Sequence, residues 1–288
     1  MDSLTMPLSE EVPRAIQALD FEHTHRTYWE QNECLLLEQF LPPEVVEHHL
    51  LPDVEQLRAE VHRNYIPKHK KGGSVSYYTL AEKAPVFLDL YRSPAFIDFI
   101  SRLVGVAVMP CPDDDPHACA LYFYTEAGDH IGFHYDTSYY KGARYTILMG
   151  LVQRSAHCRL ICQLYKGDST RAMQEIRLAT PPGAMVIFNG NKLWHAIAPL
   201  EAGAERIVLT MEYVTNPAMG PFHRFISNMK DAIAYFGFSA VLRGALSRQR
   251  GDSPRAYLPA ARSIMTPFLA HNLSRGSIGC NPPIRPTL

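Results

Sequence analysis

The sequence predicts a mainly β fold with flanking helices, of the β-sandwich or barrel kind that includes jelly rolls and cupins. Three observations support this class. Between residues 119 and 215, eight short β-rich runs follow one another at fairly even spacing, separated by Gly, Pro, Asp and Lys turn residues. The segments before and after this region show helical spacing of apolar residues instead. A chain of 288 residues, 47% of them hydrophobic, is also long enough to bury a core around such a sheet.

Residues 1–118 are predicted to form a mainly helical N-terminal support. Within this zone, the apolar run 34–40 indicates a short buried strand. A helix is expected to start at the Pro42–Pro43 pair, because apolar residues then recur at steps of three and four between 46 and 61.

Two further segments of the same zone have clear signals. The stretch "KHKKGGSVSYYTL", 68–80, is basic and contains two glycines, so we expect a loop there. Ser93 and Pro94 mark a helix start and Gly105 marks a helix end, which together predict a helix over 93–105.

The eight β-rich runs make up the predicted core, 119–215, and a helical extension, 216–288, is expected to follow it. All three zones are predicted to pack as a single domain, 1–288, with the terminal helices on the outside of the β core. One face of the first C-terminal helix is expected to carry Phe225, Met229, Ile233 and Phe236.

The charge balance argues against a strongly electrostatic partner. With 28 Lys+Arg, 29 Asp+Glu and a formal net charge of −1, neither nucleic acid nor an anionic membrane surface is expected. No run reaches the ~18 continuous apolar residues that a membrane span needs. The first residues lack a secretory signal pattern, and the six cysteines include no CxxC pair, so we expect a cytoplasmic protein with free thiols.

His134 and Asp136, in the run "HIGFHYD", are the first candidate metal ligands. Residues i and i+2 of a strand project to the same face, so one metal ion could accept both. The next candidate is His195, in "LWHAIAP". Two imidazoles and one carboxylate make the facial triad that suits non-haem Fe(II) and dioxygen chemistry. Each piece also has a purely structural interpretation, because an HxD tripeptide is common and His195 could be a hydrogen-bonded core histidine.

Arg206 begins the last predicted core strand, "RIVLTMEYV". An arginine that points into a barrel of apolar strands is costly to desolvate without an anionic partner. That partner could be a bound carboxylate or an internal Asp or Glu. Tyr124 and Tyr122 have the same parity on the strand before the metal strand, so both phenols are expected to point inward, toward a ligand or into the core.

Together these residues give the order Tyr…Gly…His-x-Asp…His…Arg on eight predicted strands. In this order the chain resembles the Fe(II)/2-oxoglutarate-dependent oxygenases, above all their prolyl-hydroxylase and phytanoyl-type branches. The resemblance covers residues 119–215, and its most specific parts are "HYD", "LWHAIAP" and "GAERIVL". It implies a double-stranded β-helix core of the jelly-roll, cupin-like type, with Fe(II), the cosubstrate 2-oxoglutarate and O2 as cofactors.

The resemblance also implies roles for individual side chains. His134, Asp136 and His195 would be the metal ligands and the catalytic residues. Arg206 would hold the distal carboxylate of 2-oxoglutarate, with Tyr124 as a second donor.

Two positions, Val208 and Asp136, bear on how closely the chain follows the family pattern. Family members often carry Ser or Thr two positions after the arginine, where this chain has Val208, so Thr146 and Thr210 are the expected substitutes in binding the cosubstrate. Related halogenases have a small residue in place of Asp136, which leaves room for chloride. The full triad of this chain therefore argues against halogenation.

The activity that the resemblance implies is oxidation of an unactivated C–H bond, with release of succinate and CO2. Hydroxylation is expected, with desaturation or cyclisation as alternatives. The expected substrate is a small molecule such as an amino acid or a natural-product intermediate, because 68–80 and the C-terminal helices resemble lid material. Whether they act as lids is not predicted. The candidate substrate-binding residues are Tyr122, Tyr139, Tyr140 and Arg144.

Other functions stay open on the sequence alone. A protein or peptide hydroxylase of the same family and a non-catalytic, cupin-type metal-binding protein are both compatible with these residues. Nucleic-acid repair is disfavoured, because the repair branch typically has a second arginine where this chain has Glu212. Oligomeric state is not predicted.

Overall fold

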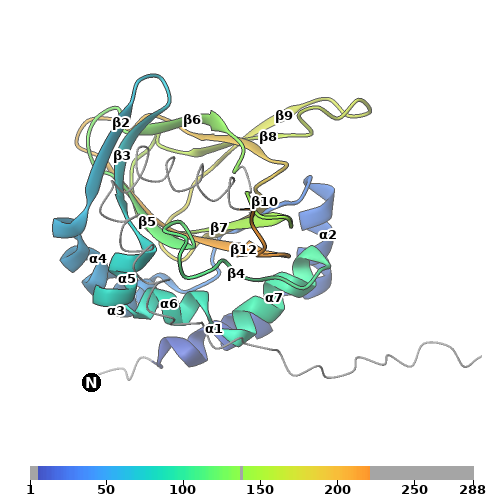
Figure 1. Cartoon of the computed structure of the whole chain (residues 1–288), viewed down its shortest axis with the longest axis horizontal. Helices are drawn as coiled ribbons and strands as arrows, with labels where there is room; N and C mark the ends of the chain where they lie inside the picture. Colours follow the sequence, from blue (N-terminus) through green and yellow to red (C-terminus); the bar gives the residue numbers. More distant parts are fainter. Residues whose placement is uncertain (1–5, 137–138, 221–288) are drawn as a thin grey trace, which may run out of the picture. The chain divides into compact units, whose positions relative to one another are not determined.

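The structure, a computed structural model, describes residues 6–136 and 139–220. Its central feature is an antiparallel sheet that curves into a barrel (Figure 1). The order in the sheet is β1-β10-β7-β12-β5-β3-β6-β11-β8-β9, with β2 added beside β3 and β4 beside β12. The strands are β1 Cys34–Leu37, β2 His62–Ile66, β3 Lys70–Val75, β4 Met109–Pro110, β5 Cys119–Tyr124, β6 His130–His134, β7 Arg144–Arg154, β8 Leu160–Leu164, β9 Gln174–Leu178, β10 Met185–Asn189, β11 Trp194–Ile197 and β12 Glu205–Val214.

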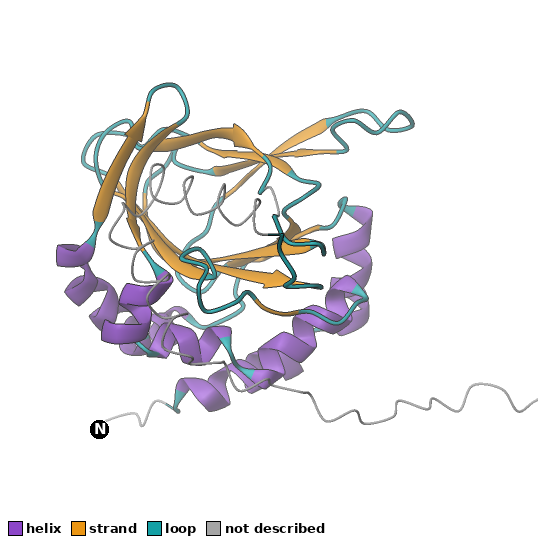
Figure 2. Cartoon of the chain, in the orientation of Figure 1, coloured by secondary structure: helices purple, strands orange, loops and turns teal. Residues whose placement is uncertain are grey.

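Helices from the N-terminal zone cover the outer face of one half of the barrel, along the lower side of Figure 2. The helices are α1 Leu8–Ala18, α2 Phe21–Glu30, α3 Pro43–His49, α4 Leu51–Leu57, a 3-10 turn Arg58–Glu60, α5 Tyr77–Lys83, α6 Val86–Tyr91 and α7 Pro94–Val104. The prediction of a mainly β fold with flanking helices is confirmed, and all eight predicted core runs are strands, β5 to β12.

Alternation along the strands divides the sheet residues between two environments. On β12, Ile207, Leu209 and Met211 pack with the helices in the larger apolar core. Their neighbours Val208 and Thr210 face the barrel interior. Because successive side chains point to opposite faces of a strand, this arrangement follows from the alternating sequence. The interior face is therefore free to carry polar residues.

Capping residues fix the start and the end of the helix α7. Ser93 caps α7 by accepting from the backbone N–H of Phe96, Pro94 occupies its first turn, and Gly105 ends it at φ +74°. This helix is confirmed as predicted. The helix expected to start at the Pro42–Pro43 pair is broken at Leu50, and the 62–66 segment is a strand.

The prediction of a loop at 68–80 is wrong. Residues 70–75 form β3, which makes a hairpin with β2 and lies between β5 and β6. Glycine there serves packing, because a Cβ at Gly73 would come within 2.4 Å of Cγ1 of Val61. Lys70 is likewise buried rather than solvated, with its ammonium 5.2 Å from the ring centre of Tyr122.

This strand also connects the two halves of the barrel. Gly73 pairs with Phe123 of β5, and Lys70 pairs with Ile131 of β6. One short strand thus joins the half of the sheet that contacts the helices to the half that carries two of the candidate metal ligands. A lid role for 68–80 is not compatible with a strand held on both sides.

Some predictions fall outside the described residues. The C-terminal helix face at 225–236 and most of the extension 216–288 belong to this group, and the single-domain prediction stays a prediction. Within the described ranges, no helix is long and apolar enough to cross a membrane.

Candidate metal centre

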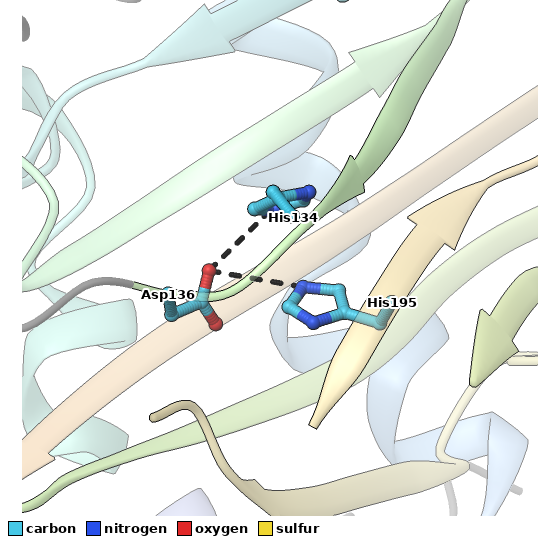
Figure 3. Close-up of side chains that lie close together, drawn as sticks. All are labelled: His134, Asp136 and His195. Carbon is cyan, nitrogen blue, oxygen red and sulfur yellow. Dashed lines mark ion pairs between the residues drawn. The ribbon is translucent and has the colours of Figure 1, made fainter. Parts of the chain in front are cut away.

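Two neighbouring strands bring the predicted ligands together. β6 and β11 are antiparallel partners, and His134 is paired directly with His195 in their register. Asp136 lies two residues beyond His134, just after β6 ends. Its Oδ1 atom is 3.4 Å from Nε2 of His134 and 3.7 Å from Nε2 of His195 (Figure 3). One ligand atom from each residue lies within 4.8 Å of the others. These are the only three residues of the described chain that form such a cluster.

Backbone carbonyls fix which nitrogen of each histidine faces the centre. Nδ1 of His134 lies 2.8 Å from the carbonyl oxygen of Gly132, and Nδ1 of His195 lies 3.0 Å from that of Leu193. A carbonyl oxygen only accepts, so each Nδ1 carries the proton. In a neutral ring the lone pair is then on Nε2, the atom that points at Asp136, which is the arrangement of metal-binding histidines.

The electrostatics of the site favour the same protonation states. Burial lowers the pKa of His195 to about 4, so its ring is neutral at pH 7. Burial alone would raise the pKa of Asp136, but the charges of His195, His134 and Arg144 hold that pKa well below its usual range. Two Nε2 atoms that face the centre and one carboxylate are therefore available as ligands. This donor set fits a divalent first-row metal such as Fe(II).

The triad opens onto a pocket with about 780 Å³ of empty space, part of it open to solvent. Along one wall, β12 turns Arg206, Val208, Thr210 and Glu212 inward. Arg206 and Glu212 are six residues apart, so they stand roughly 20 Å from each other along the strand. The pocket thus has one charged end at Arg206 and another at Glu212. The triad, contributed by β6, β11 and the residue after β6, also lines this pocket.

At one end, Arg206 is fully buried without a carboxylate partner. Its Nη2 donates to Oγ1 of Thr180 at 3.1 Å, and its guanidinium lies 5.2 Å from the ring centre of Tyr124. Nε and Nη1 have no hydrogen-bond partner in the described structure. The internal Asp or Glu considered as an alternative partner is therefore not there. Two open donor groups of a buried cation are a ready site for a carboxylate.

Thr180 was missed by the sequence analysis. It lies in the connection between β9 and β10, is fully buried, and supplies the hydroxyl that Val208 lacks. A residue in a Thr-Pro-Pro-Gly turn has no strand parity to reveal where it points, so the sequence holds no signal for this contact. Both predicted substitutes, Thr146 and Thr210, line the pocket, and the hydroxyl of Thr146 contacts Asp136 and Glu212 rather than Arg206.

At the other end, Arg144 and Glu212 form a largely buried ion pair. Nε of Arg144 donates to Oε2 of Glu212 at 2.9 Å, with 12% and 4% of the two side chains exposed. Burial raises the pKa of Glu212 to about 7, although Arg144 opposes the shift. Glu212 shares the inward parity of Arg206, and that parity could have identified it from the sequence.

Asp115 is a second acid at this end. It is buried: its Oδ1 accepts from the backbone N–H of His117 and its Oδ2 from the hydroxyl of Tyr140. Asp115 and His117 both line the pocket.

The predicted substrate-binding residues divide into two groups. Tyr122, Tyr139 and Arg144 line the pocket. Tyr140 is packed in the larger apolar core and is not among the described lining residues. A substrate contact stays a prediction for all four residues.

Comparison with known proteins gives the family. A family model described as Halogenase D matches residues 17–221, well over half of the chain. No curated protein sequence matches it.

Solved structures show what the fold is similar to. One is the non-heme alpha ketoglutarate dependent epimerase SnoN from nogalamycin biosynthesis, at 14% identity and a TM-score of 0.56, over 67% of this chain and 80% of that one. Another is an oxidoreductase of the 2OG-Fe(II) oxygenase family from Burkholderia pseudomallei, at 13% identity and a TM-score of 0.54, over 71% and 95%. A third is a prolyl hydroxylase from Trichoplax adhaerens in complex with a hypoxia inducible factor peptide, at 13% identity and a TM-score of 0.54, over 77% and 98%.

The matched span contains the triad, both ends of the pocket and every described strand. The structural likenesses confirm the predicted jelly-roll core, with its curved, nearly closed antiparallel sheet and helices on one side. The chain belongs to the Halogenase D family and has the double-stranded β-helix fold of the iron and 2-oxoglutarate oxygenases.

Proposed function

We propose that this chain is an Fe(II)/2-oxoglutarate-dependent dioxygenase that hydroxylates a small molecule. One observation carries the proposal: a His-Asp-His cluster shares its pocket with a buried arginine that has two open donor groups. A metal alone would explain the cluster but not Arg206. A metal together with a dicarboxylate explains both.

The side chains fit this cofactor pair. His134, Asp136 and His195 would hold the iron, and Arg206 would bind the distal carboxylate of 2-oxoglutarate, with Thr180 orienting the guanidinium. When bound, iron and 2-oxoglutarate supply the oxidising power to functionalise an unactivated C–H bond with O2, releasing succinate and CO2. Structural neighbours support the fit, since SnoN has been solved in complex with Fe3+ and alpha ketoglutarate.

The protein's own contribution is to orient the reactants and exclude water. Part of the pocket wall is apolar, and its members include Leu148, Leu160, Ile197 and Val208. Apolar walls strengthen every charge interaction inside the pocket and keep bulk water from the reacting atoms. The charged end near Glu212 leaves a separate, polar region for the second substrate.

Oxygenation fits the site better than halogenation, although the matching family model is described as a halogenase. Asp136 occupies the position that is small in related halogenases, and its carboxylate faces both histidines. A carboxylate there fills the place that a chloride ion would need. The proposal is therefore hydroxylation, with desaturation or cyclisation as variants of the same chemistry.

A small-molecule substrate is favoured by the lining of the pocket. It combines apolar side chains with a few convergent polar and charged ones, which is typical of small-molecule sites. Relatives of this fold include enzymes of nogalamycin biosynthesis as well as a peptide-bound prolyl hydroxylase. Peptide hydroxylation is therefore the second candidate, and a non-catalytic metal protein is disfavoured by the unpaired donors of Arg206.

The test is anaerobic binding followed by turnover. Purified protein with Fe(II) and 2-oxoglutarate should show a metal-to-ligand charge-transfer band, and exposure to O2 should yield succinate. His134→Ala and Asp136→Ala should abolish both signals. His130→Ala is the matched control, because His130 lies on the same strand and bonds the Gly128 carbonyl outside the pocket lining.

A screen with the same purified protein distinguishes a small-molecule substrate from a peptide substrate. Screening amino acids and natural-product intermediates against proline-containing peptides, with detection of oxygen incorporation by mass, separates the two substrate classes. A wild-type protein that neither binds 2-oxoglutarate nor forms succinate contradicts the dioxygenase proposal.

A further inference from the structure

We propose that Thr146 is a positioning residue of the metal centre, which holds Asp136 so that this ligand binds the metal through Oδ1 alone. The inference rests on the proposed metal site and deepens it. Oδ1 of Asp136 faces Nε2 of both histidines, whereas Oδ2 accepts a hydrogen bond of 2.7 Å from the hydroxyl of Thr146. The two oxygens of one carboxylate therefore have separate partners.

The location of Thr146 is fixed by the sheet. On β7 it is paired with Phe188 of β10 on one side and with Glu212 of β12 on the other. Only 2% of the residue is exposed. Its β-branched side chain has few rotamers available, so the hydroxyl is held in place before any metal binds.

The hydroxyl of Thr146 also contacts the Arg144–Glu212 pair. Oγ1 of Thr146 lies 2.9 Å from Oε2 of Glu212 as well as 2.7 Å from Oδ2 of Asp136. One hydroxyl hydrogen serves one of these acceptors at a time. Oε2 of Glu212 also accepts from Nε of Arg144. Oδ2 of Asp136 is the nearer of the two acceptors, so we assign the hydroxyl proton to it.

Asp136 needs this support because it lies beyond the end of β6. Its backbone N–H donates to the carbonyl of Gly190, which fixes the main chain but not the carboxylate. A Cβ at Gly190 would lie 2.8 Å from Cβ of Asp136 and 3.0 Å from Oγ1 of Thr146, so glycine is required for this close approach. Gly190 thus leaves room for the Thr146 hydroxyl to reach the carboxylate of Asp136. A carboxylate that binds through one oxygen leaves a coordination position open for the cosubstrate.

The test measures metal binding in the absence of 2-oxoglutarate, with Co²⁺ as the probe. Thr146→Val removes the hydroxyl while nearly keeping the side-chain shape. Its affinity for Co²⁺ should fall by about 10–100-fold, the usual effect of losing a residue that orients a ligand. The visible Co²⁺ spectrum should also change as the carboxylate becomes free to bind with both oxygens. Thr146→Ser keeps the hydroxyl and should restore both affinity and spectrum.

A matched control separates positioning from a general loss of a buried hydrogen bond. Thr24 is also buried, and its hydroxyl donates to the Asp20 carbonyl on α2. Thr24→Val should bind Co²⁺ with wild-type affinity and spectrum. A Thr146→Val protein with unchanged affinity and an unchanged spectrum overturns the inference.

Two further outcomes are decisive. If Thr146→Val does not fold, infrared carboxylate stretches of the wild-type Co²⁺ protein with ¹³C-labelled aspartate answer the question, because bidentate binding by Asp136 overturns the inference. Wild-type protein that binds Co²⁺ in a Thr146-dependent way but never consumes 2-oxoglutarate overturns the dioxygenase proposal alone. Wild-type protein that binds no metal overturns both.

Discussion

Two arginines point into the same pocket, and their partners differ. Arg144 donates to the carboxylate of Glu212, whereas Arg206 donates only to the hydroxyl of Thr180 and keeps two donor groups open in the described structure. A buried charge that already has a counter-charge needs no ligand to compensate it. A buried charge without one is costly to the empty protein and is explained by a ligand. The difference indicates which end of the pocket binds an anion.

Breaking the paired end should have the largest effect on stability. Arg144→Met leaves Glu212 largely buried without its counter-charge, so we expect the free energy of unfolding to fall by about 3 kcal/mol. Chemical denaturation at pH 7 measures this change. Arg144→Met combined with Glu212→Leu removes both charges and should recover most of the loss. A single variant as stable as the wild type would show that the pair contributes little.

Breaking the unpaired end should instead change ligand affinity. Arg206→Met removes the charge-assisted hydrogen bonds to the distal carboxylate, and 2-oxoglutarate should bind at least about 100-fold more weakly. Stability without ligand should stay the same or rise, because the variant no longer buries an unpaired charge. Anaerobic titration and thermal unfolding report the two quantities. Arg154→Met, at an exposed surface pair with Glu205, is the control and should change neither.

The smallest effect on ligand affinity is expected for Thr180→Val, which tests whether Thr180 acts through Arg206. Losing one hydrogen bond to a buried guanidinium costs about 1 kcal/mol, so the affinity for 2-oxoglutarate should fall roughly fivefold. The effect should vanish in an Arg206→Met background, since Thr180 acts only through that arginine. A fivefold loss that persists in the double variant contradicts the assigned role.

Much of the fold could be predicted because strand periodicity is a local signal. The eight core strands and the α7 helix have alternating or capped sequences that specify them without tertiary context. The 70–75 strand could not be recognised in this way. Its lysines and glycines are typical of a loop, and only its neighbours on both sides make it a strand. A strand whose glycines serve close packing has no hydrophobic alternation to detect.

The site shows the same division. His134, Asp136 and Arg206 could be identified because strand parity and residue chemistry point to them directly. Thr180 and Asp115 could not, since both lie in connections whose conformation the sequence does not encode locally. Glu212 was accessible in principle from its parity on β12. Its pairing with Arg144 depends on the β7–β12 register, which is a property of the folded sheet.

The close approach of Gly190 to Asp136 has a consequence for how this site can change in evolution. The space beside Asp136 is shared by two positions that are 54 residues apart in the sequence, and the closest approach is to Cβ of residue 136. The two positions are therefore coupled. Any residue with a Cβ at 136, alanine as much as aspartate, requires glycine at 190, so residue 136 can be exchanged only while position 190 stays glycine.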